Sequence, residues 1–416
     1  MTQERFETVI IGGGQAGLAA AYCLQKRGRP AVIVDENERI GDAWRKRWDS
    51  LRLFTPAKYD GLPGWRFPAP GWSFPTKDEM ADYLEAYAAR FDLDVRSGVR
   101  VERLAKKDGR FVIAAGAETF EADNVIVATG AHRLPKVPSF ASELDPAIVQ
   151  LHSSEYVSPA QLRDGPVLVV GLGNSGAEIA FELVRTRPTW VAGKEDGEIP
   201  VRHGSVPARF MLPVIRFLGH HVLTKGTPVG RKVGPKVAET TPLIRTKTKH
   251  LVEVGVERGG RVAGAQDGLP LLEDGRVVDV PNVVWCTGFR REFGWIDLPV
   301  FDAGGELQHE RGVVREVPGL YFVGLLFQYS ITSDVLPGVG RDAERIAKHL
   351  AMSHARRVVR DSERSPRPRS GPVEGVWGNR EVPPAELQSS HAHRVVPGVD
   401  VEDRSGDVLG VVGEEI

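Results

Sequence analysis

Two short glycine turns are the features of this sequence that point most directly to chemistry. The spacing G-x-G-x-x-G occurs in IGGGQAG near the start of the chain and in VGLGNSG near its middle. In such a turn the first glycine permits a sharp bend, the second lets the backbone approach a pyrophosphate, and the third lets the following helix pack on the strand. The N–H groups at the start of that helix then face the phosphates. The sequence therefore predicts two dinucleotide sites, built from Gly12, Gly14, Gln15, Ala16 and Gly17 and from Gly171, Gly173, Asn174, Ser175 and Gly176.

The residues that follow the second strand of each unit indicate which nucleotide each turn holds. The strand AVIVDE ends in Asp35 and Glu36, about twenty residues beyond the first turn, where a carboxylate accepts hydrogen bonds from a ribose diol and repels a 2′-phosphate. The acidic end of this strand therefore predicts that the first turn binds FAD or NAD. The corresponding strand of the second unit ends WVAGK, and Lys194 favours a 2′-phosphate and hence NADPH, with an ordinary solvated lysine as the alternative interpretation. A protein that holds two dinucleotides is expected to pass electrons between them.

Each turn lies between an apolar run and a helical pattern. Residues 6–11, 16–28 and 31–36 predict strand, helix and strand, and residues 167–194 repeat this unit. A βαβ unit implies parallel strands. The predicted fold is therefore α/β, with two Rossmann-like dinucleotide-binding domains whose parallel sheets are flanked by helices.

The order of the segments predicts a discontinuous first domain with the second domain inserted into it. The segment NVVWCTG echoes the earlier NVIVATG. We expect the first part of an FAD-binding domain in residues 1–155, an NAD(P)H-binding domain in 156–281 and the closing part of the FAD-binding domain in 282–352. Residues 353–416, rich in proline, arginine and serine, predict a disordered tail.

Two further segments predict irregular structure inside these domains. Residues 45–75 are dense in proline, glycine and tryptophan, which is typical of an irregular excursion with aromatic walls. Residues 203–250 are polar and basic with little periodicity, so we expect a partly irregular insertion there.

Composition narrows the class of protein. A net charge of −1 over 416 residues argues against a nucleic-acid surface and against a polybasic membrane anchor. Cys23 and Cys286 form no C-x-x-C pair and no metal cluster, which argues against dithiol chemistry and predicts no metal site. No apolar run reaches the roughly 20 residues of a membrane span, and the chain enters a strand without a signal peptide. We therefore expect a cytoplasmic protein without a membrane span.

Six segments, in this order, carry a family resemblance: GGGQAG, IGDAWRKRWDSLRLFTP, ATG, HSSEY, GLGNSGAEIA and CTGF. They resemble the flavin-containing monooxygenases, which are class B flavoprotein monooxygenases. The likeness is greatest to the bacterial CzcO-type branch, which is related to the plant YUCCA enzymes. It covers most of the chain and leaves the tail unexplained. The resemblance implies FAD on the first turn and NADPH on the second.

The resemblance also implies which residues lie beside the cofactors. IGDAW resembles the family's IGGTW, which lies by the flavin, and ATG and CTG resemble its crossings between the domains. With the glycine-rich stretch before the last helix, these positions are Gly41, Trp44, Arg45, Ala128, Thr129, Gly130, Thr287, Gly288 and Gly324.

Two positions are candidates for catalysis. Of the family fingerprint F-x-G-x-x-x-H-x-x-x-Y, His152 and Tyr156 are present, whereas Pro146 and Ile148 depart from it. His152 is therefore a candidate for a direct role. Thr55 stands where several family members place an asparagine beside the flavin.

The mechanism that the resemblance implies is oxygenation at the expense of NADPH. Reduced flavin would capture O₂ as a hydroperoxide, which passes one oxygen atom to a small amine, sulfur or carbonyl substrate. The aromatic residues of 45–75 would keep water away. Two alternatives stay open: a reductase or oxidase that uses NAD(P)H without oxygen transfer, and a non-enzymatic nucleotide-binding accessory protein. Neither the substrate nor the oligomeric state follows from the sequence.

Overall fold

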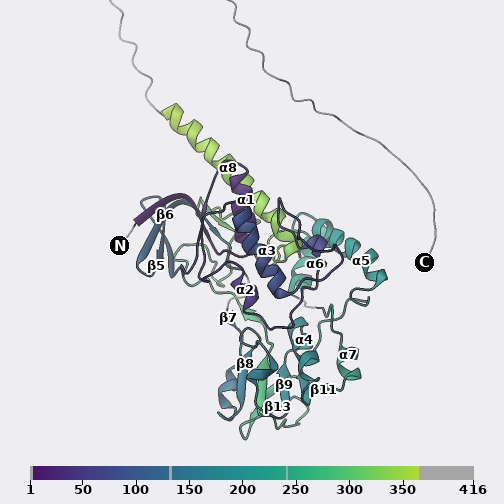
Figure 1. Ribbon diagram of the computed structural model, residues 1–416. Coiled ribbons are helices and arrows are strands. Elements are labelled where there is room, and N and C mark those ends of the chain that lie inside the picture. Colours follow the sequence, from purple (N-terminus) through teal and green to yellow (C-terminus); the bar gives the residue numbers. More distant parts are fainter. Residues whose placement is uncertain (1–2, 131–133, 240–241, 365–416) are drawn as a thin grey trace, which may run out of the picture. The chain divides into compact units, whose positions relative to one another are not determined.

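The computed structural model describes residues 3–130, 134–239 and 242–364, in which two sheets carry the two glycine turns (Figure 1). The first sheet has the order β3 (Val95–Arg96), β2 (Val32–Val34), β1 (Gln3–Ile11), β6 (Glu118–Val127), β5 (Arg110–Ala115) and β4 (Arg103–Lys107), and β16 (Leu320–Phe322) also pairs with β6. The pairs β3–β2, β2–β1, β1–β6 and β6–β16 are parallel. The predicted parallel unit is thereby confirmed, while β4, β5 and the start of β6 form an antiparallel meander.

The second sheet is parallel in all its pairs. Its order is β11 (Glu257–Gly259), β10 (Thr189–Ala192), β9 (Val167–Val170), β14 (Asn282–Trp285) and β8 (Val149–His152). Two short antiparallel pairs complete the strands: β12 (Val262–Gln266) with β13 (Leu269–Leu272), and β15 (Phe289–Arg290) with β7 (Leu134–Pro135).

Helices cover both sheets. Helices α1 (Gln15–Gln25), α3 (Lys77–Arg90) and α8 (Leu336–Arg364) share one apolar core with the first sheet, and α2 (Asp42–Arg45) contacts α3. Helices α4 (Asn174–Leu183) and α7 (Thr248–Glu253) lie against one face of the second sheet, and β13 and the short 3₁₀ helix Ser139–Glu143 contribute to the core on the other. This arrangement is the α/β fold that the sequence predicts.

The central strands are apolar on both faces. In β1, Ile10 belongs to one core, while Val9 and Ile11 belong to the core on the opposite face. In β9, Val167 and Val169 face one core and Leu168 the other. Because helices or loops bury both faces, these strands are continuous apolar runs without the alternation of a half-exposed strand.

The predicted domain boundaries need a correction. The sequence predicts β8 and β14 in the two parts of the first domain, but both pair within the second sheet, β8 with β14 and β14 with β9. The echo between NVIV and NVVW has a structural reason. Residues 124–127 lie in β6 beside β1, and β14 lies beside β9, so the two segments are equivalent strands of two similar sheets.

The expectation of a partly irregular insertion at 203–250 also needs correction. This segment contains α5 (Val206–Phe217), a π turn (Leu218–Val222), α6 (Pro228–Glu239) and α7. Prolines inside α5 and α6 weakened the helical pattern, although Ser205 and a proline in the first turn of α5 are typical of a helix start. Residues of this segment contact 327–341, which follow the first sheet: Lys225 N–H donates to the carbonyl oxygen of Tyr329 at 2.7 Å.

The end of the described chain is helical. Helix α8 continues to Arg364, into the segment assigned to the tail, because residues 351–364 contain neither proline nor glycine and Pro366 follows shortly after. The remaining residues of the predicted tail, 365–416, lie outside the described residues. Within the described ranges, no helix is long and apolar enough to cross a membrane.

Candidate active site

The first glycine turn has the backbone geometry that a pyrophosphate needs. Gly12 has φ +108°, and a Cβ there would lie 2.6 Å from the carbonyl oxygen of Ala128. A Cβ on Gly17 would overlap the carbonyl oxygen of Gly12, so glycine is required for α1 to approach β1 this closely. Around Gly14, by contrast, no described residue beyond its chain neighbours comes within 4 Å of an added Cβ. The space beside Gly14 is therefore open to a ligand.

The second glycine turn repeats this geometry. Gly171 has φ +110°, and a Cβ there would overlap the carbonyl oxygen of Cys286. A Cβ on Gly176 would overlap the carbonyl oxygen of Gly171. Gly14 and Gly173, which precede the helices, have ψ of −173° and −172°. The two turns are thus the same local structure on two sheets.

Free N–H groups follow each turn. The first helical hydrogen bonds run from Leu18 N–H to the Gly14 oxygen and from Ala177 N–H to the Gly173 oxygen, both at 3.0 Å. The N–H groups that precede them have no acceptor within their own helix. They belong to Gln15, Ala16 and Gly17 and to Asn174, Ser175 and Gly176. Together with the positive ends of the helix dipoles, they fit the two phosphates of a dinucleotide.

The two acids at the end of β2 occupy different places. Asp35 lies at the first turn, since its Oδ2 accepts from Gly13 N–H at 2.5 Å and its Oδ1 accepts from Asn37 N–H at 2.9 Å. Glu36 is exposed and lies 3.9 Å from Arg100. The geometry therefore favours Asp35 as the acid next to a bound ribose.

Lys194 follows the strand end beside the second turn. Its neighbour Gly193 has φ +147°, and a Cβ there would lie 3.0 Å from the backbone nitrogen of Leu172. The backbone at 193 thus packs against the glycine turn, and Lys194 is exposed next to it. A cation at this position lies where the adenosine end of a dinucleotide is expected.

The IGDAW segment lies between the first sheet and α3. Gly41 has φ +92°, and a Cβ there would lie 2.5 Å from the carbonyl oxygen of Ala81. The Arg45 guanidinium donates to the Ile40 carbonyl oxygen at 2.7 Å and pairs with Asp82 at 2.8 Å and with Glu85 at 2.9 Å. Arg45 therefore joins α2 to α3, whereas Trp44, partly buried against the first core, stays a predicted flavin contact.

The two crossing segments run side by side. Ala128, Thr129 and Gly130 follow β6, and Thr287 and Gly288 follow β14; beyond them β7 pairs with β15. The Thr287 hydroxyl donates to the carbonyl oxygen of Lys136. Gly324, predicted from a distant part of the sequence, lies against the first turn, since a Cβ there would be 3.0 Å from the Ala16 Cβ.

His152 holds one of these crossings. Its ring is buried, with Nε2 at 3.0 Å from the Gly288 carbonyl oxygen and Nδ1 at 2.8 Å from the Ser154 hydroxyl. Burial lowers the pKa of His152, which favours the neutral ring. Because both ring nitrogens are used within the protein, the geometry favours a structural role over the direct role predicted from sequence.

A buried carboxyl group that no sequence motif marks accompanies Thr55. The Thr55 hydroxyl donates to Oδ1 of Asp60, a residue with 0% exposure, and Oδ2 of Asp60 has no hydrogen-bond partner among the described residues. Burial raises the pKa of Asp60 to about 7, against the opposing effect of the Thr55 hydrogen bond. The signal available in sequence was a single acid in the otherwise uncharged run YDGLPGW.

Comparisons with known proteins agree with this architecture. The family described as pyridine nucleotide-disulphide oxidoreductase matches residues 9–197. A CzcO-like oxidoreductase of Geobacillus kaustophilus is 37% identical over 351 residues, which cover 84% of this chain and 99% of that protein. The indole-3-pyruvate monooxygenase YUCCA1 of Oryza sativa is 30% identical, with 84% and 93% of the two chains covered. A solved flavin-containing monooxygenase from Stenotrophomonas maltophilia is 26% identical with a TM-score of 0.66, over 84% of this chain and 99% of the other.

The chain belongs to the flavin monooxygenase family. It is accordingly an oxidoreductase, as the two glycine turns predict.

The two cysteine thiols of this flavin monooxygenase have packing roles. Cys23 and Cys286 are free, and burial raises the pKa of each to about 12. A thiol with so high a pKa is neutral at physiological pH and a poor nucleophile. Within the described residues, no group of three or more histidine, cysteine or acidic side chains is arranged to hold a metal ion.

The aromatic excursion of this flavin monooxygenase is irregular, as predicted, with one short 3₁₀ helix at Ala57–Tyr59. Its side chains divide between several packing sites. Trp48 belongs to the core of the second sheet, and Phe67 to that of the first. Phe74 contacts His203 with ring centroids 4.0 Å apart, and His203 Nε2 lies 2.9 Å from the Phe54 carbonyl oxygen. The helical insertion therefore contacts the excursion next to Thr55.

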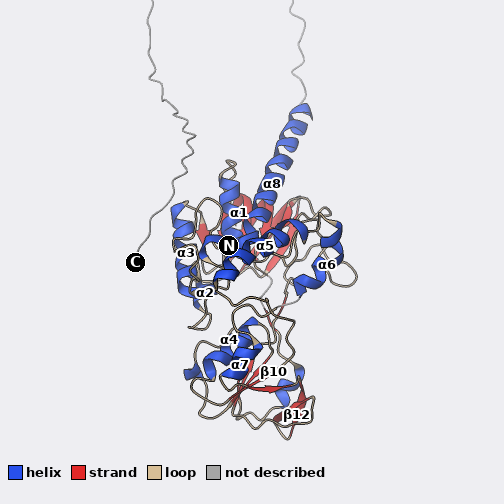
Figure 2. Ribbon diagram, turned by 90° about the vertical axis from the view of Figure 1, so that its right-hand side faces the viewer, coloured by secondary structure: helices blue, strands red, loops and turns tan. Residues whose placement is uncertain are grey.

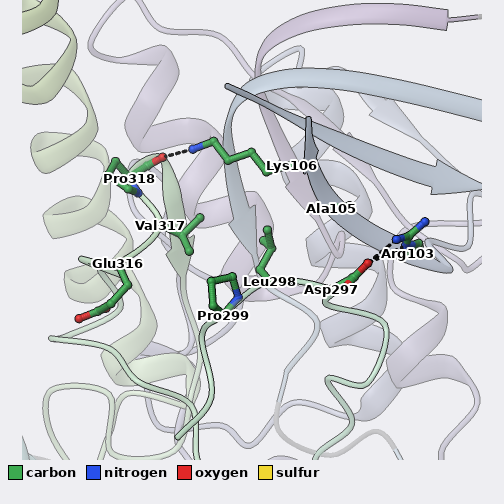
Figure 3. A pocket seen from close by; sticks show the side chains of 9 residues that line it. All are labelled: Arg103, Ala105, Lys106, Asp297, Leu298, Pro299, Glu316, Val317 and Pro318. Atoms are coloured by element: carbon green, nitrogen blue, oxygen red, sulfur yellow. Dashed lines mark hydrogen bonds and ion pairs between the residues drawn. The ribbon is translucent and has the colours of Figure 1, made fainter. Parts of the chain in front are cut away.

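A surface pocket of about 420 Å³ lies away from the turns (Figure 3). It lies at β4, where Lys106 Nζ donates to the Pro318 carbonyl oxygen at 2.9 Å and Arg103 pairs with Asp297. None of its lining residues belongs to either glycine turn, so this pocket is not the dinucleotide site of the monooxygenase.

Proposed function

We propose that this chain is an FAD-containing, NADPH-dependent monooxygenase that oxygenates a small substrate at a nucleophilic amine or sulfur atom, or at a carbonyl group. The observation that carries the proposal is the pair of equivalent glycine turns, one beside Asp35 and the other beside Lys194. An acid excludes a 2′-phosphate and a base attracts one, so the two turns suit different dinucleotides.

The chain's own groups bind and orient the cofactors in this proposal. N–H groups at the start of α1 hold the pyrophosphate of FAD, and Asp35 accepts from its ribose. The start of α4 holds the pyrophosphate of NADPH, and Lys194 pairs with its 2′-phosphate. His152, bonded to Gly288, keeps the second crossing in register with β8. A flavin bound there would supply the redox chemistry, with NADPH as the source of reducing equivalents and O₂ as the source of the oxygen atom.

The test of oxygen transfer is rapid mixing of the NADPH-reduced protein with oxygenated buffer. We expect a transient absorbance band at about 370–390 nm that persists for seconds, followed by oxidised flavin. Addition of an oxygen-accepting amine, sulfide or ketone should shorten its lifetime. Direct reoxidation with prompt release of H₂O₂, with or without such substrates, would contradict oxygen transfer and indicate a reductase or oxidase.

A second prediction concerns the choice between NADPH and NADH. Lys194→Ala is expected to raise KM for NADPH by about tenfold or more while KM for NADH changes little, because a charge-assisted contact to phosphate contributes roughly 1.5–3 kcal/mol. Steady-state kinetics with both nucleotides measure this preference. Lys107→Ala, an exposed lysine on β4 of the first sheet, is the matched control. An unchanged preference in Lys194→Ala would assign that lysine to the solvated surface.

A further inference from the structure

Helix α5 carries an apolar face that points to solvent. Val206, Phe210, Val214 and Phe217 recur every three or four residues and therefore share one side of the helix. Their exposed fractions are 63%, 76%, 56% and 58%, and Ala208 alone is buried among the residues of this helix. A surface helix normally turns its apolar stripe to the core, as Ala208, Leu212 and Ile215 do here, so the exposed residues form a second apolar stripe on the solvent side of α5.

The apolar surface continues beyond α5. Leu218 follows in the π turn, and Val229 and Val233 are exposed one turn apart on α6. Figures 1 and 2 both show α5 and α6 beside one another. Of the fifteen large hydrophobic side chains exposed among the described residues, seven belong to this set. We call the set the α5–α6 surface: Val206, Phe210, Val214, Phe217, Leu218, Val229 and Val233.

The α5–α6 surface is strongly basic at its margins. Between residues 202 and 239 the chain has seven lysines and arginines and a single acid, Glu239. Lys232 and Lys236 are exposed on α6, the helix that carries Val229 and Val233. The net charge of −1 for the whole chain conceals this local excess of basic residues.

The orientation of α5 is fixed by contacts on its other side. The guanidinium of Arg216 lies 5.1 Å from the ring centroid of Tyr59, and that of Arg209 lies 5.8 Å from the ring of Trp72. The π turn is anchored as well, since Arg341 donates to the carbonyl oxygen of His220 at 2.5 Å. Phe217 contacts the ring of His221, with centroids 4.9 Å apart, and the apolar face otherwise stays largely in solvent.

We infer that the α5–α6 surface docks on an anionic lipid surface, with its apolar side chains among the acyl chains and the exposed lysines of α6 at the headgroups. Phenylalanine and valine on one helical face, flanked by cations, are the composition of an interfacial helix. Anionic headgroups supply the complementary charge.

A second copy of the chain fits this surface less well. A twofold interface pairs a surface with itself, which would bring the excess of cations on one copy against the same cations on the other. A fluid lipid surface instead adapts to two neighbouring helices and neutralises the exposed lysines beside their apolar residues.

The test is sedimentation of the full-length protein with vesicles. We expect it to sediment with vesicles that contain phosphatidylglycerol, to bind pure phosphatidylcholine far less, and to dissociate as salt is raised. Phe210→Ser/Phe217→Ser should lower the affinity for phosphatidylglycerol vesicles by about tenfold or more, since each phenylalanine loses its burial in lipid. Lys232→Gln/Lys236→Gln should weaken binding independently and reduce the dependence on salt.

Val252→Ser/Met352→Ser is the matched control, because both side chains are exposed and lie outside the α5–α6 surface. If this control lowers vesicle binding as much as the phenylalanine variant does, the inference is overturned. A wild-type protein that ignores phosphatidylglycerol vesicles would overturn it as well. Light scattering tests the alternative of a second copy. A wild-type dimer that dissociates in Phe210→Ser/Phe217→Ser, together with an absence of vesicle binding, would overturn the inference in favour of that alternative. Unchanged thermal unfolding of each variant shows that the fold is intact.

Discussion

The Gly14→Val variant is expected to fold and to purify without flavin. Gly14 has φ −75° and ψ −173°, a conformation that valine adopts readily, and no described atom outside its neighbours obstructs an added Cβ. The new methyl groups would fill the space through which the backbone approaches the pyrophosphate. Loss of several charge-assisted N–H contacts should lower FAD affinity by about 100-fold or more. The flavin content of the purified protein, from its visible absorbance, measures this.

The equivalent change in the second turn should leave the flavin bound and impair the reaction with NADPH. Gly173 has φ −89° and ψ −172°, so Gly173→Val is expected to keep its flavin and to lose rapid reduction of that flavin by NADPH. Gly264→Val in β12 is the control, because a Cβ there also meets nothing within 4 Å and lies outside both turns. A flavin-free Gly173→Val protein, or a fully flavinated Gly14→Val protein, would contradict the assignment of FAD to the first turn.

Local pattern was enough to predict the two dinucleotide units. Strand β1, the first glycine turn and α1 follow one another within the chain, and each is determined by residues a few positions apart. Burial on both faces makes strands such as β9 continuous apolar runs, which stand out in a sequence. The same logic predicted the irregular excursion, since proline and glycine act locally.

Features that depend on distant partners were missed or misassigned. Strand β14 resembles β6, and its pairing with β9 depends on a contact across more than a hundred residues, so sequence placed it in the wrong sheet. His152 has a family position, yet its role depends on the Gly288 carbonyl oxygen. Helix α5 is hard to recognise in sequence because apolar residues occur on both of its sides and Pro213 lies inside it.

Asp60 is the clearest case, because its burial cannot be read from its neighbours, and it has a large measurable consequence. Its pKa is raised to about 7 from an ordinary value near 4, so the folded protein keeps this proton at pH 5 and gives it up only near pH 7. The unfolded chain releases the proton at lower pH. The free energy of unfolding therefore falls as pH rises between about 4 and 7, and the loss persists above pH 7.

Asp60→Asn should remove this loss. An amide has nearly the same shape, its oxygen still accepts from the Thr55 hydroxyl, and it does not ionise. The free energy of unfolding of the variant minus that of the wild type should therefore be larger at pH 8 than at pH 5. The increase is up to about 3 kcal/mol, from the cost of ionising a buried carboxyl. Thermal unfolding at both pH values measures the difference.

Other buried carboxyls with raised pKa values, Glu178 and Asp342, are common to both proteins and cancel in the comparison. Asp196→Asn, at an exposed carboxylate, provides the control and should show no such change with pH. An Asp60→Asn variant whose stability relative to the wild type is the same at pH 5 and pH 8 would show that the Asp60 carboxyl is not desolvated. Oδ2, which has no hydrogen-bond partner in the described part of the chain, would then have to be hydrated, because water also stabilises the charged form at a buried position.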